Sequence, residues 1–292
     1  MLINRGTLDT LFTAFNAAFR EGFGQAPADH ERFTMPVTSM TSTEEYAWLG
    51  QWPGLKKWVG ERVLRGIADH EYSIKNEKFE STIEVDRDKI EDDQYGVYSP
   101  MFREAGYASG AHPCELVYAL LKDGFTAKCF DGRPFFDTAH PVGGGTQSND
   151  GGGNGAAWFL IDTKRMIKPI IHQVRRPYTL TRMDDLDDEN VFMRDQFLYG
   201  IDGRCNVGFG LWQLAYGSMA TLDSDAYRDA RAAMLSFKAD EGRPLGIVPD
   251  LLVVPPTLEE IAREVLMAER DAAGATNVWR GSAEFVVSPW LA

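Results

Sequence analysis

The segment DGRPFFDTAHP carries the side chains best suited to acid–base chemistry. It contains Asp131, Asp137 and His140, and Cys114 and Cys129 precede it as candidate nucleophiles. A nucleophile, a base and a group that orients the base must meet in space, and no local signature such as G-x-S-x-G accompanies these residues. A His-Pro pair after a strand is more typical of a turn with a hydrogen-bonded imidazole. We therefore expect no catalysis here, and a hydrolase that uses His140 with Asp137 or a cysteine is kept as an alternative.

Metal and nucleotide binding have no stronger support in the sequence. The five histidines are dispersed, without an H-x-x-x-H pair. The acidic run DDLDDEN has Asn190 where an EF-hand loop needs its glycine. The glycine-rich segment 143–155 has no lysine and no G-K-[ST] ending, so it is not a P-loop. These patterns predict a solvated acidic turn, a surface loop, no metal and no cofactor.

Three tryptophans gather in the segment AWLGQWPGLKKW, as Trp48, Trp52 and Trp58, beside the adjacent Lys56 and Lys57. They could form a platform for a sugar, part of the core, or a surface that contacts another protein. Aromatic residues are enriched at protein interfaces, and the lysines would complement acidic surface on a chain of net charge −13. The contact surface is the favoured interpretation, and a carbohydrate-binding module is an alternative.

Composition bounds the class of protein. The chain has 292 residues and 44% hydrophobic content, enough for a sizeable core in one or two domains. Its net charge of −13 disfavours direct binding to nucleic acid, which depends on Lys and Arg at phosphates. No run is typical of a signal peptide or a membrane span. Three widely spaced cysteines suit a reducing cytosol and predict neither disulfides nor a zinc site.

The first expected element is an amphipathic helix over residues 7–20. Thr7 is placed to cap its start and Gly22 to end it. This helix either packs on its own domain or acts as an arm that docks elsewhere, and the sequence leaves both interpretations open. Its apolar side chains at helical spacing include Leu11, Phe12, Phe15 and Phe19.

The remaining elements mix strands and helices. The period of two over residues 72–86 predicts a hairpin. Residues 99–124 are the longest candidate helix, in which Pro113 predicts a kink or a restart. Thr257 and Glu260 match a capping box that would open a later helix. Strands and helices do not alternate regularly, which favours the α+β class.

Several long segments resemble the major head (capsid) subunit of Mu-like tailed phages and prophages. The resemblance extends over nearly the whole chain, from the N-terminal helix to FVVSPWL. The segments that carry it are YAWLGQWPGLKKWVGERV, YSIKNEKFESTIEVDRDKIEDD, AHPCELVYALL, CFDGRPFFDTAHPV, DENVFMRDQFLYGIDGRCNVGFGLWQLAYGS and PDLLVVPPTLEEIAREVL.

The resemblance implies the Hong Kong-97-type capsid fold, in which an arm and a loop called the E-loop extend from a peripheral and an axial domain. On this chain it implies an N-terminal arm over 1–38, an E-loop region over 39–78, a peripheral domain over 79–155 with a spine helix near 99–123, a mainly axial domain over 156–280, and a closing strand of the peripheral domain over 281–292.

The function implied is structural, without catalysis or cofactor. Copies of such a subunit assemble into hexamers and pentamers of an icosahedral shell, which encloses double-stranded DNA without sequence-specific binding and changes shape as the procapsid matures. The implied partners are copies of the chain, a scaffold protein, a portal and, as an open option, a cement protein. The expected location is the virion, with assembly in the host cytoplasm and no membrane. An encapsulin-like compartment on the same fold is the main alternative.

The E-loop of this family reaches over a neighbouring subunit, so the tryptophan segment is expected to become ordered on assembly. We expect Trp52→Ala, or deletion of residues 1–22, to leave a folded subunit that fails to close shells. The predicted inter-subunit contacts are Leu11, Phe12, Phe15 and Phe19 in the arm, and Trp48, Trp52, Lys56, Lys57 and Trp58 in or beside the E-loop.

Overall fold

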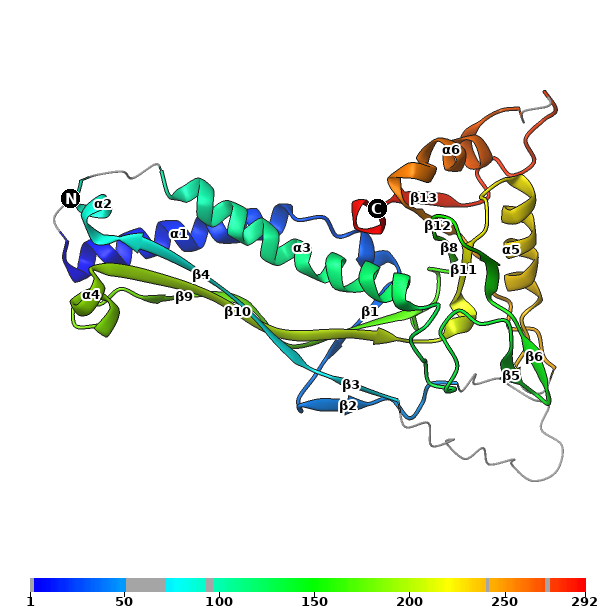
Figure 1. Cartoon of the computed structure of the whole chain (residues 1–292), viewed down its shortest axis with the longest axis horizontal. Helices are drawn as coiled ribbons and strands as arrows, with labels where there is room; N and C mark the ends of the chain where they lie inside the picture. Colours follow the sequence, from blue (N-terminus) through cyan, green and yellow to red (C-terminus); the bar gives the residue numbers. More distant parts are fainter. Residues whose placement is uncertain (1–2, 51–71, 93–96, 240–241, 271–273) are drawn as a thin grey trace.

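The structure is a computed structural model, and it describes residues 3–50, 72–92, 97–239, 242–270 and 274–292. Figure 1 shows an elongated unit of two long helices on a long sheet, joined at one end to a more compact unit. The C-terminus lies where the two units meet, and α1 begins at the narrow far end. Helices and strands are mixed without regular alternation, which confirms the predicted α+β class.

The elongated unit is a four-stranded sheet in the order β1-β9-β10-β4, with two helices along one face (Figure 1). β10 pairs antiparallel with both β4 and β9, and β1 pairs parallel with the start of β9. Two short helices lie at the narrow end. The elements are α1 (Arg5–Gln25), β1 (Thr34–Thr38), β4 (Glu77–Asp86), α2 (Arg87–Glu91), α3 (Ser99–Asp123), β9 (Ile170–Met183), α4 (Glu189–Arg194) and β10 (Gln196–Phe209).

α1 starts earlier and ends later than the sequence pattern predicts. Asn4 caps it by accepting a hydrogen bond from the Thr7 backbone N–H, and Thr7 completes a capping box. Gly22 does not end the helix but marks a close crossing. A Cβ on Gly22 would lie 1.8 Å from the Arg103 carbonyl oxygen, and one on Gly106 would lie 2.0 Å from the Phe19 carbonyl oxygen. The two helices therefore touch backbone to backbone.

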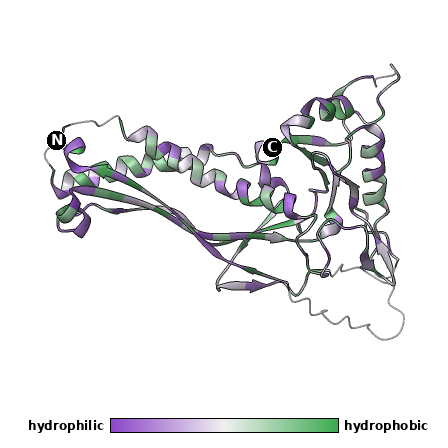
Figure 2. Ribbon diagram, in the orientation of Figure 1, coloured by the Kyte–Doolittle hydropathy of each residue, from purple (hydrophilic) through white to green (hydrophobic). Residues whose placement is uncertain are grey.

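The helix predicted near 99–123 is present as α3, Ser99–Asp123, in a single piece. Pro113 neither ends nor restarts it, because apolar residues on both sides of the proline, among them Ala111, Cys114 and Val117, are buried. Tertiary packing outweighs the backbone hydrogen bond that proline forfeits. Figure 2 shows the consequence of one-sided burial, since hydrophobic and hydrophilic stretches alternate along the two long helices.

The hairpin predicted over 72–86 is wrong. β3 (Ser73–Lys75) pairs with β2 (Thr43–Glu45), whereas β4 pairs with β10 in a different sheet. The buried Asn76 separates the two strands. Its Nδ2 donates to Ser39 Oγ (2.7 Å) and to the Thr41 carbonyl (3.0 Å), which bends the chain from one sheet into the next. The chain changes from one sheet to another at this polar residue. The two-residue hydrophobic period does not predict such a change of pairing partner.

The compact unit is built on a five-stranded sheet in the order β13-β12-β8-β11-β7. Its central strands β8 and β12 are buried along their whole length, which explains their continuous apolar sequences. A two-stranded β5–β6 ladder lies beside the sheet. The elements are β5 (His140–Val142), β6 (Gly145–Gln147), β7 (Asp150–Gly153), β8 (Trp158–Ile161), β11 (Ala215–Met219), α5 (Ser224–Ser236), β12 (Leu251–Val254), α6 (Glu259–Met267) and β13 (Glu284–Val287).

Two local predictions in this unit differ from the structure. The glycine-rich segment 143–155 lies mostly at the surface, as predicted, but it supplies the strands β6 and β7, and β7 pairs with β11. The fully buried Asn149 between the two strands anchors the segment. The capping box of Thr257 and Glu260 does not form. α6 begins at Glu259 directly after a 3₁₀ turn, and no side chain caps it.

The two sheets cut across the expected division of the chain. The predicted 156–280 unit includes β9 and β10, but these strands pair with each other, and with β1 and β4 respectively, in the sheet of the elongated unit. Each is a strand of fourteen residues, long enough to span that unit. Residues 281–292 supply β13, which pairs with β12 in the compact unit, while Trp290 stacks on Tyr118 of α3 at 5.9 Å between ring centroids. Within the described residues, no helix is long and apolar enough to cross a membrane.

Candidate functional sites

The predicted contact residues of α1 lie mostly inside the chain's own core. Leu11, Phe15 and Phe19 are buried in a cluster shared with α3 and the sheet. The Phe15 ring stacks on Phe102 at 4.1 Å and meets Tyr199 edge-on at 5.4 Å. Of the two interpretations that the sequence left open, the structure therefore shows the helix packed on its own domain. Deletion of residues 1–22 would remove much of this core, so a folded product is no longer expected.

Phe12 is the exception among these four residues. It is partly exposed, with the Arg182 guanidinium 4.9 Å above its ring and Tyr199 stacked at 6.4 Å. Arg182 is also ion-paired with Asp9, and that hydrogen bond raises the pKa of Arg182. Phe12 thus presents an aromatic edge and a fixed cation on one surface, a pairing found where proteins meet.

Trp48 lies at the base of the tryptophan segment. It is partly buried, it packs against the main core, and its ring meets Tyr46 at 6.3 Å. Tyr46 donates to Gln173 Oε1 (2.7 Å), and burial raises its pKa to about 12. The segment therefore starts from a fixed anchor on the sheet. The other predicted contacts in this segment, Trp52, Lys56, Lys57 and Trp58, lie outside the described residues.

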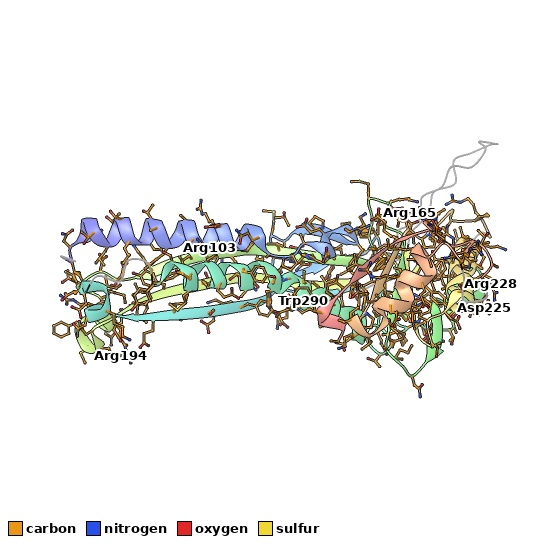
Figure 3. All side chains as sticks on the ribbon, turned by 90° about the horizontal axis from the view of Figure 1, so that it is seen from above. Arg103, Arg165, Arg194, Asp225, Arg228 and Trp290 are labelled. Carbon is orange, nitrogen blue, oxygen red and sulfur yellow. The ribbon has the colours of Figure 1, made fainter. Side chains whose placement is uncertain are left out.

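An apolar surface that no sequence pattern predicted lies at the narrow end of the elongated unit. Phe192 and Met193 in the short helix α4 are 83% and 69% exposed. Arg194, labelled in Figure 3, marks their position at the tip. The sequence signal is the apolar run 191–193 within the acidic stretch DDLDDENVFMRD, which folds into a helix too short to bury all of its apolar side chains. Other exposed apolar residues in the neighbouring segments are Val97, Met101, Met183 and Leu186.

The candidate acid–base residues form a buried cluster with partners that differ from those expected. His140 Nδ1 lies 2.6 Å from Asp131 Oδ2, and Cys129 donates its thiol proton to Asp131 Oδ1 at 3.1 Å. Asp137 instead accepts from the Ala139 backbone. Cys114 is elsewhere, 3.1 Å from the His30 ring.

Asn149 fixes the other side of the His140 ring. Its Nδ2 donates to the carbonyl oxygens of Phe135, Trp212 and Ala215, so its Oδ1 must face His140 Nε2, at 3.1 Å. The imidazole ring stacks on Trp212 with 4.0 Å between centroids. His140 therefore donates from Nε2 and is held on three sides.

This cluster is unsuited to hydrolysis. Burial raises the pKa of the Cys129 thiol, which keeps it protonated, and a thiol is a poor nucleophile. Burial alone would raise the pKa of Asp131, but hydrogen bonds from His140, Cys129 and the Arg133 backbone outweigh it and hold that pKa below its usual value. The His140 side chain is fully buried, so no substrate reaches it. The residues serve structure.

Three other histidines lie between α3 and the sheet. His30 and His172 meet edge-on at 5.9 Å, and His112 Nδ1 lies 2.7 Å from the Tyr178 hydroxyl. Burial lowers the pKa of all three, and that of His172 reaches about 4. His172 Nε2 has no hydrogen-bond partner within the described residues. This is a site of pH sensitivity in the fold.

Comparison with known proteins gives matches over the whole chain. A family model described as the Mu-like prophage major head subunit gpT matches residues 8–291. The Mu-like prophage FluMu major head subunit of Haemophilus influenzae is 41% identical, over 92% of this chain and 91% of that protein. The major capsid protein of Escherichia phage Mu is 37% identical over the full length of both.

Solved structures agree in fold. A subunit of the procapsid of bacteriophage JBD30 superposes with a TM-score of 0.88 at 43% identity, over 99% of this chain and all of that one. A subunit of the JBD30 capsid superposes with a TM-score of 0.82 at 32% identity, over all of both chains.

Proposed function

The chain belongs to the family of Mu-like prophage major head subunits, so its function is that of a major capsid protein. We propose that its copies form the hexamers and pentamers of an icosahedral shell around double-stranded DNA. The full-length similarity to a procapsid subunit, at 43% identity, carries the proposal. The encapsulin-like compartment is not favoured, since the sequence relatives are phage head proteins. The buried His140 cluster disfavours the hydrolase.

Within this proposal, the elongated unit is the peripheral domain and the compact unit is the axial domain. The spine helix is α3, and α1 is fixed on it through the crossing at Gly22 and Gly106. α1 therefore belongs to the body of the peripheral domain rather than to a free arm. Of the four predicted contact residues in α1, Phe12 is the one that stays partly exposed to a neighbouring copy.

The tryptophan segment is proposed as the E-loop, which rises from the anchor at Trp48. Trp52, Trp58, Lys56 and Lys57 are its proposed contacts with the next subunit. Two tryptophans removed from water contribute a few kcal/mol at each contact, on the order of 25 cal/mol per Å² of apolar area. Repetition of this contact around a capsomer makes closure cooperative.

The proposed partners are copies of the chain, a scaffold protein, a portal and a cement protein. A capsid of JBD30 is decorated with minor capsid protein trimers, and an equivalent decoration of this shell is part of the proposal. The net charge of −13 suits a wall that encloses DNA without binding its phosphates.

Trp52→Ala tests the contact proposal. Wild type and variant are expressed with the candidate scaffold and separated on sucrose gradients, with electron microscopy of the fast fractions. We expect closed shells from wild type, and capsomers or monomers with unchanged circular dichroism from the variant. Tyr107→Ala, at an exposed aromatic residue on α3, is the matched control. Wild-type shells from Trp52→Ala would refute the E-loop contact.

A further inference from the structure

The buried cluster of Cys129, Asp131 and His140 has more than a packing role available to it. The thiol sulfur, a carboxylate oxygen and an imidazole nitrogen all lie within 4.8 Å of one another. Ligand atoms around a tetrahedral Zn²⁺ are roughly 3.3–3.8 Å apart, given bonds of about 2.0–2.3 Å. Small rotations of the three side chains would therefore bring all of them onto one ion.

The charge of the cluster is also matched to a divalent ion. The hydrogen bond from the Cys129 thiol to Asp131 Oδ1 and the one between His140 Nδ1 and Asp131 Oδ2 each require one proton. With His140 Nε2 protonated toward Asn149, the cluster is neutral overall. One Zn²⁺ that replaces these two protons meets one thiolate, one carboxylate and one neutral imidazole, and the total charge stays zero. Burial therefore does not oppose the exchange electrostatically.

The surroundings are those that orient metal ligands in other proteins. A ligating histidine usually donates its second N–H to a fixed oxygen, and His140 Nε2 faces Asn149 Oδ1, which three carbonyl oxygens lock in place. Asp131 Oδ1 accepts from the Arg133 backbone N–H at 3.0 Å. Both contacts leave His140 Nδ1 and the second Asp131 oxygen directed into the cluster.

We propose that Cys129, Asp131 and His140 form a structural Zn²⁺ site in the major capsid subunit, with a water molecule as the fourth ligand. Asp131 is the least buried of the three residues and lies in the turn Cys129–Arg133, so the proposed route for water and metal is past this turn. On binding, the Cys129 thiol and the His140–Asp131 pair each release one proton to solvent.

The ion would staple a segment that has little regular structure. Between the end of α3 and the start of β8, the chain forms the short strands β5, β6 and β7 and one isolated bridge, Lys128↔Pro134. Cys129 and Asp131 lie in the turn closed by this bridge, and His140 is the first residue of β5, so one ion would link the turn to the strand. Because a site of this kind is absent from the unfolded chain, metal binding adds directly to folding stability.

The test uses the full-length chain, stripped with a chelator and titrated with Co²⁺ as a spectroscopic substitute for Zn²⁺. We expect one equivalent to bind, with a thiolate-to-cobalt charge-transfer band in the near ultraviolet and the visible bands of tetrahedral Co²⁺. Zn²⁺ should displace it and raise the unfolding temperature. Elemental analysis of protein purified without chelator should give close to one zinc per chain.

Two near-isosteric variants and one control make the result specific. Cys129→Ser should abolish the charge-transfer band, and Asp131→Asn should weaken binding by about tenfold or more. Cys205→Ser, at a buried cysteine of β10, should bind as wild type does. If stripped wild-type protein binds no Co²⁺, or if the Cys129→Ser spectrum equals that of wild type, the proposal is wrong. Circular dichroism of each metal-free variant separates lost binding from lost folding.

Discussion

Asn149 shows how much of the compact unit depends on one side chain. Its amide reaches three carbonyl oxygens, the His140 ring and the Asp137 backbone N–H, and these partners lie in loops and turns or at the first residues of β5 and β11. Backbone groups outside helices and sheets need such partners when they are buried. A single asparagine thus replaces the hydrogen bonds that a ladder would supply.

Asn149→Leu should destabilise the subunit by roughly 3 kcal/mol or more, because it leaves several buried polar groups without partners. Urea unfolding followed by tryptophan fluorescence measures the loss. Asn154→Leu, at an exposed position of the same glycine-rich segment, should stay within about 0.5 kcal/mol of wild type. Equal stability of the two variants would contradict the role assigned to Asn149.

His172 makes stability depend on pH. Its pKa falls from about 6.5 in the unfolded chain to about 4 in the fold, by burial first and then by the nearby His30. Between these pH values only the unfolded chain binds the proton, so stability decreases as the pH is lowered through this window. The loss should be on the order of 2 kcal/mol from His172 alone.

His172→Leu should flatten this part of the profile while leaving the pH 8 value similar, because the substituted side chain cannot titrate. The midpoints of urea unfolding of wild type and variant, taken at intervals between pH 4 and pH 8, measure this difference in pH dependence. Glu31 partly opposes the effect, and His30 and His112 keep their own contributions, so the slope should shrink without vanishing. A wild-type profile that is flat over this range would overturn the assignment.

At the scale of elements, the crossing of α1 and α3 depends on the absence of side chains. Gly106→Ala should cost more than about 1 kcal/mol, since its Cβ would lie 2.0 Å from the Phe19 carbonyl oxygen and force the helices apart. Gly24→Ala, in the same helix pair with open space around its Cβ, should be neutral or stabilising by up to about 1 kcal/mol. The unfolding temperatures of both variants test this prediction, and a Gly106→Ala protein as stable as wild type would contradict the close crossing.

The elements also show what the sequence can and cannot predict. The helical repeat gave α1 and α3 to within a few residues, because one-sided burial leaves a periodic trace. The packing partner of each element was harder to predict, because periodicity indicates which face is buried but not which element covers that face. The alternation in β4 is real, yet it does not identify β10 as the partner strand, and the partner of His140 proved to be Asp131 rather than Asp137. Long-range contacts of this kind leave no local pattern.

At the scale of the whole molecule, the exposed apolar tip is the clearest sign of association. Phe192→Ser should leave unfolding within about 0.5 kcal/mol of wild type, because that side chain is 83% exposed in the isolated subunit. Shell yield on sucrose gradients should nevertheless fall severalfold if the tip is covered in the assembled particle. Val278→Ser, at a 77% exposed residue of the compact unit, is the control. Full yield from Phe192→Ser would show that the tip stays uncovered.

The most direct test of the account is electron cryomicroscopy of particles formed by the purified chain with its candidate scaffold. We predict closed shells of hexamers and pentamers, in which the α3 helix and the β4–β10–β9 sheet of every copy fit the map and the segment that follows Trp48 lies on a neighbouring copy. A chain that stays monomeric in sedimentation at every concentration, with and without scaffold, would contradict the proposed assembly.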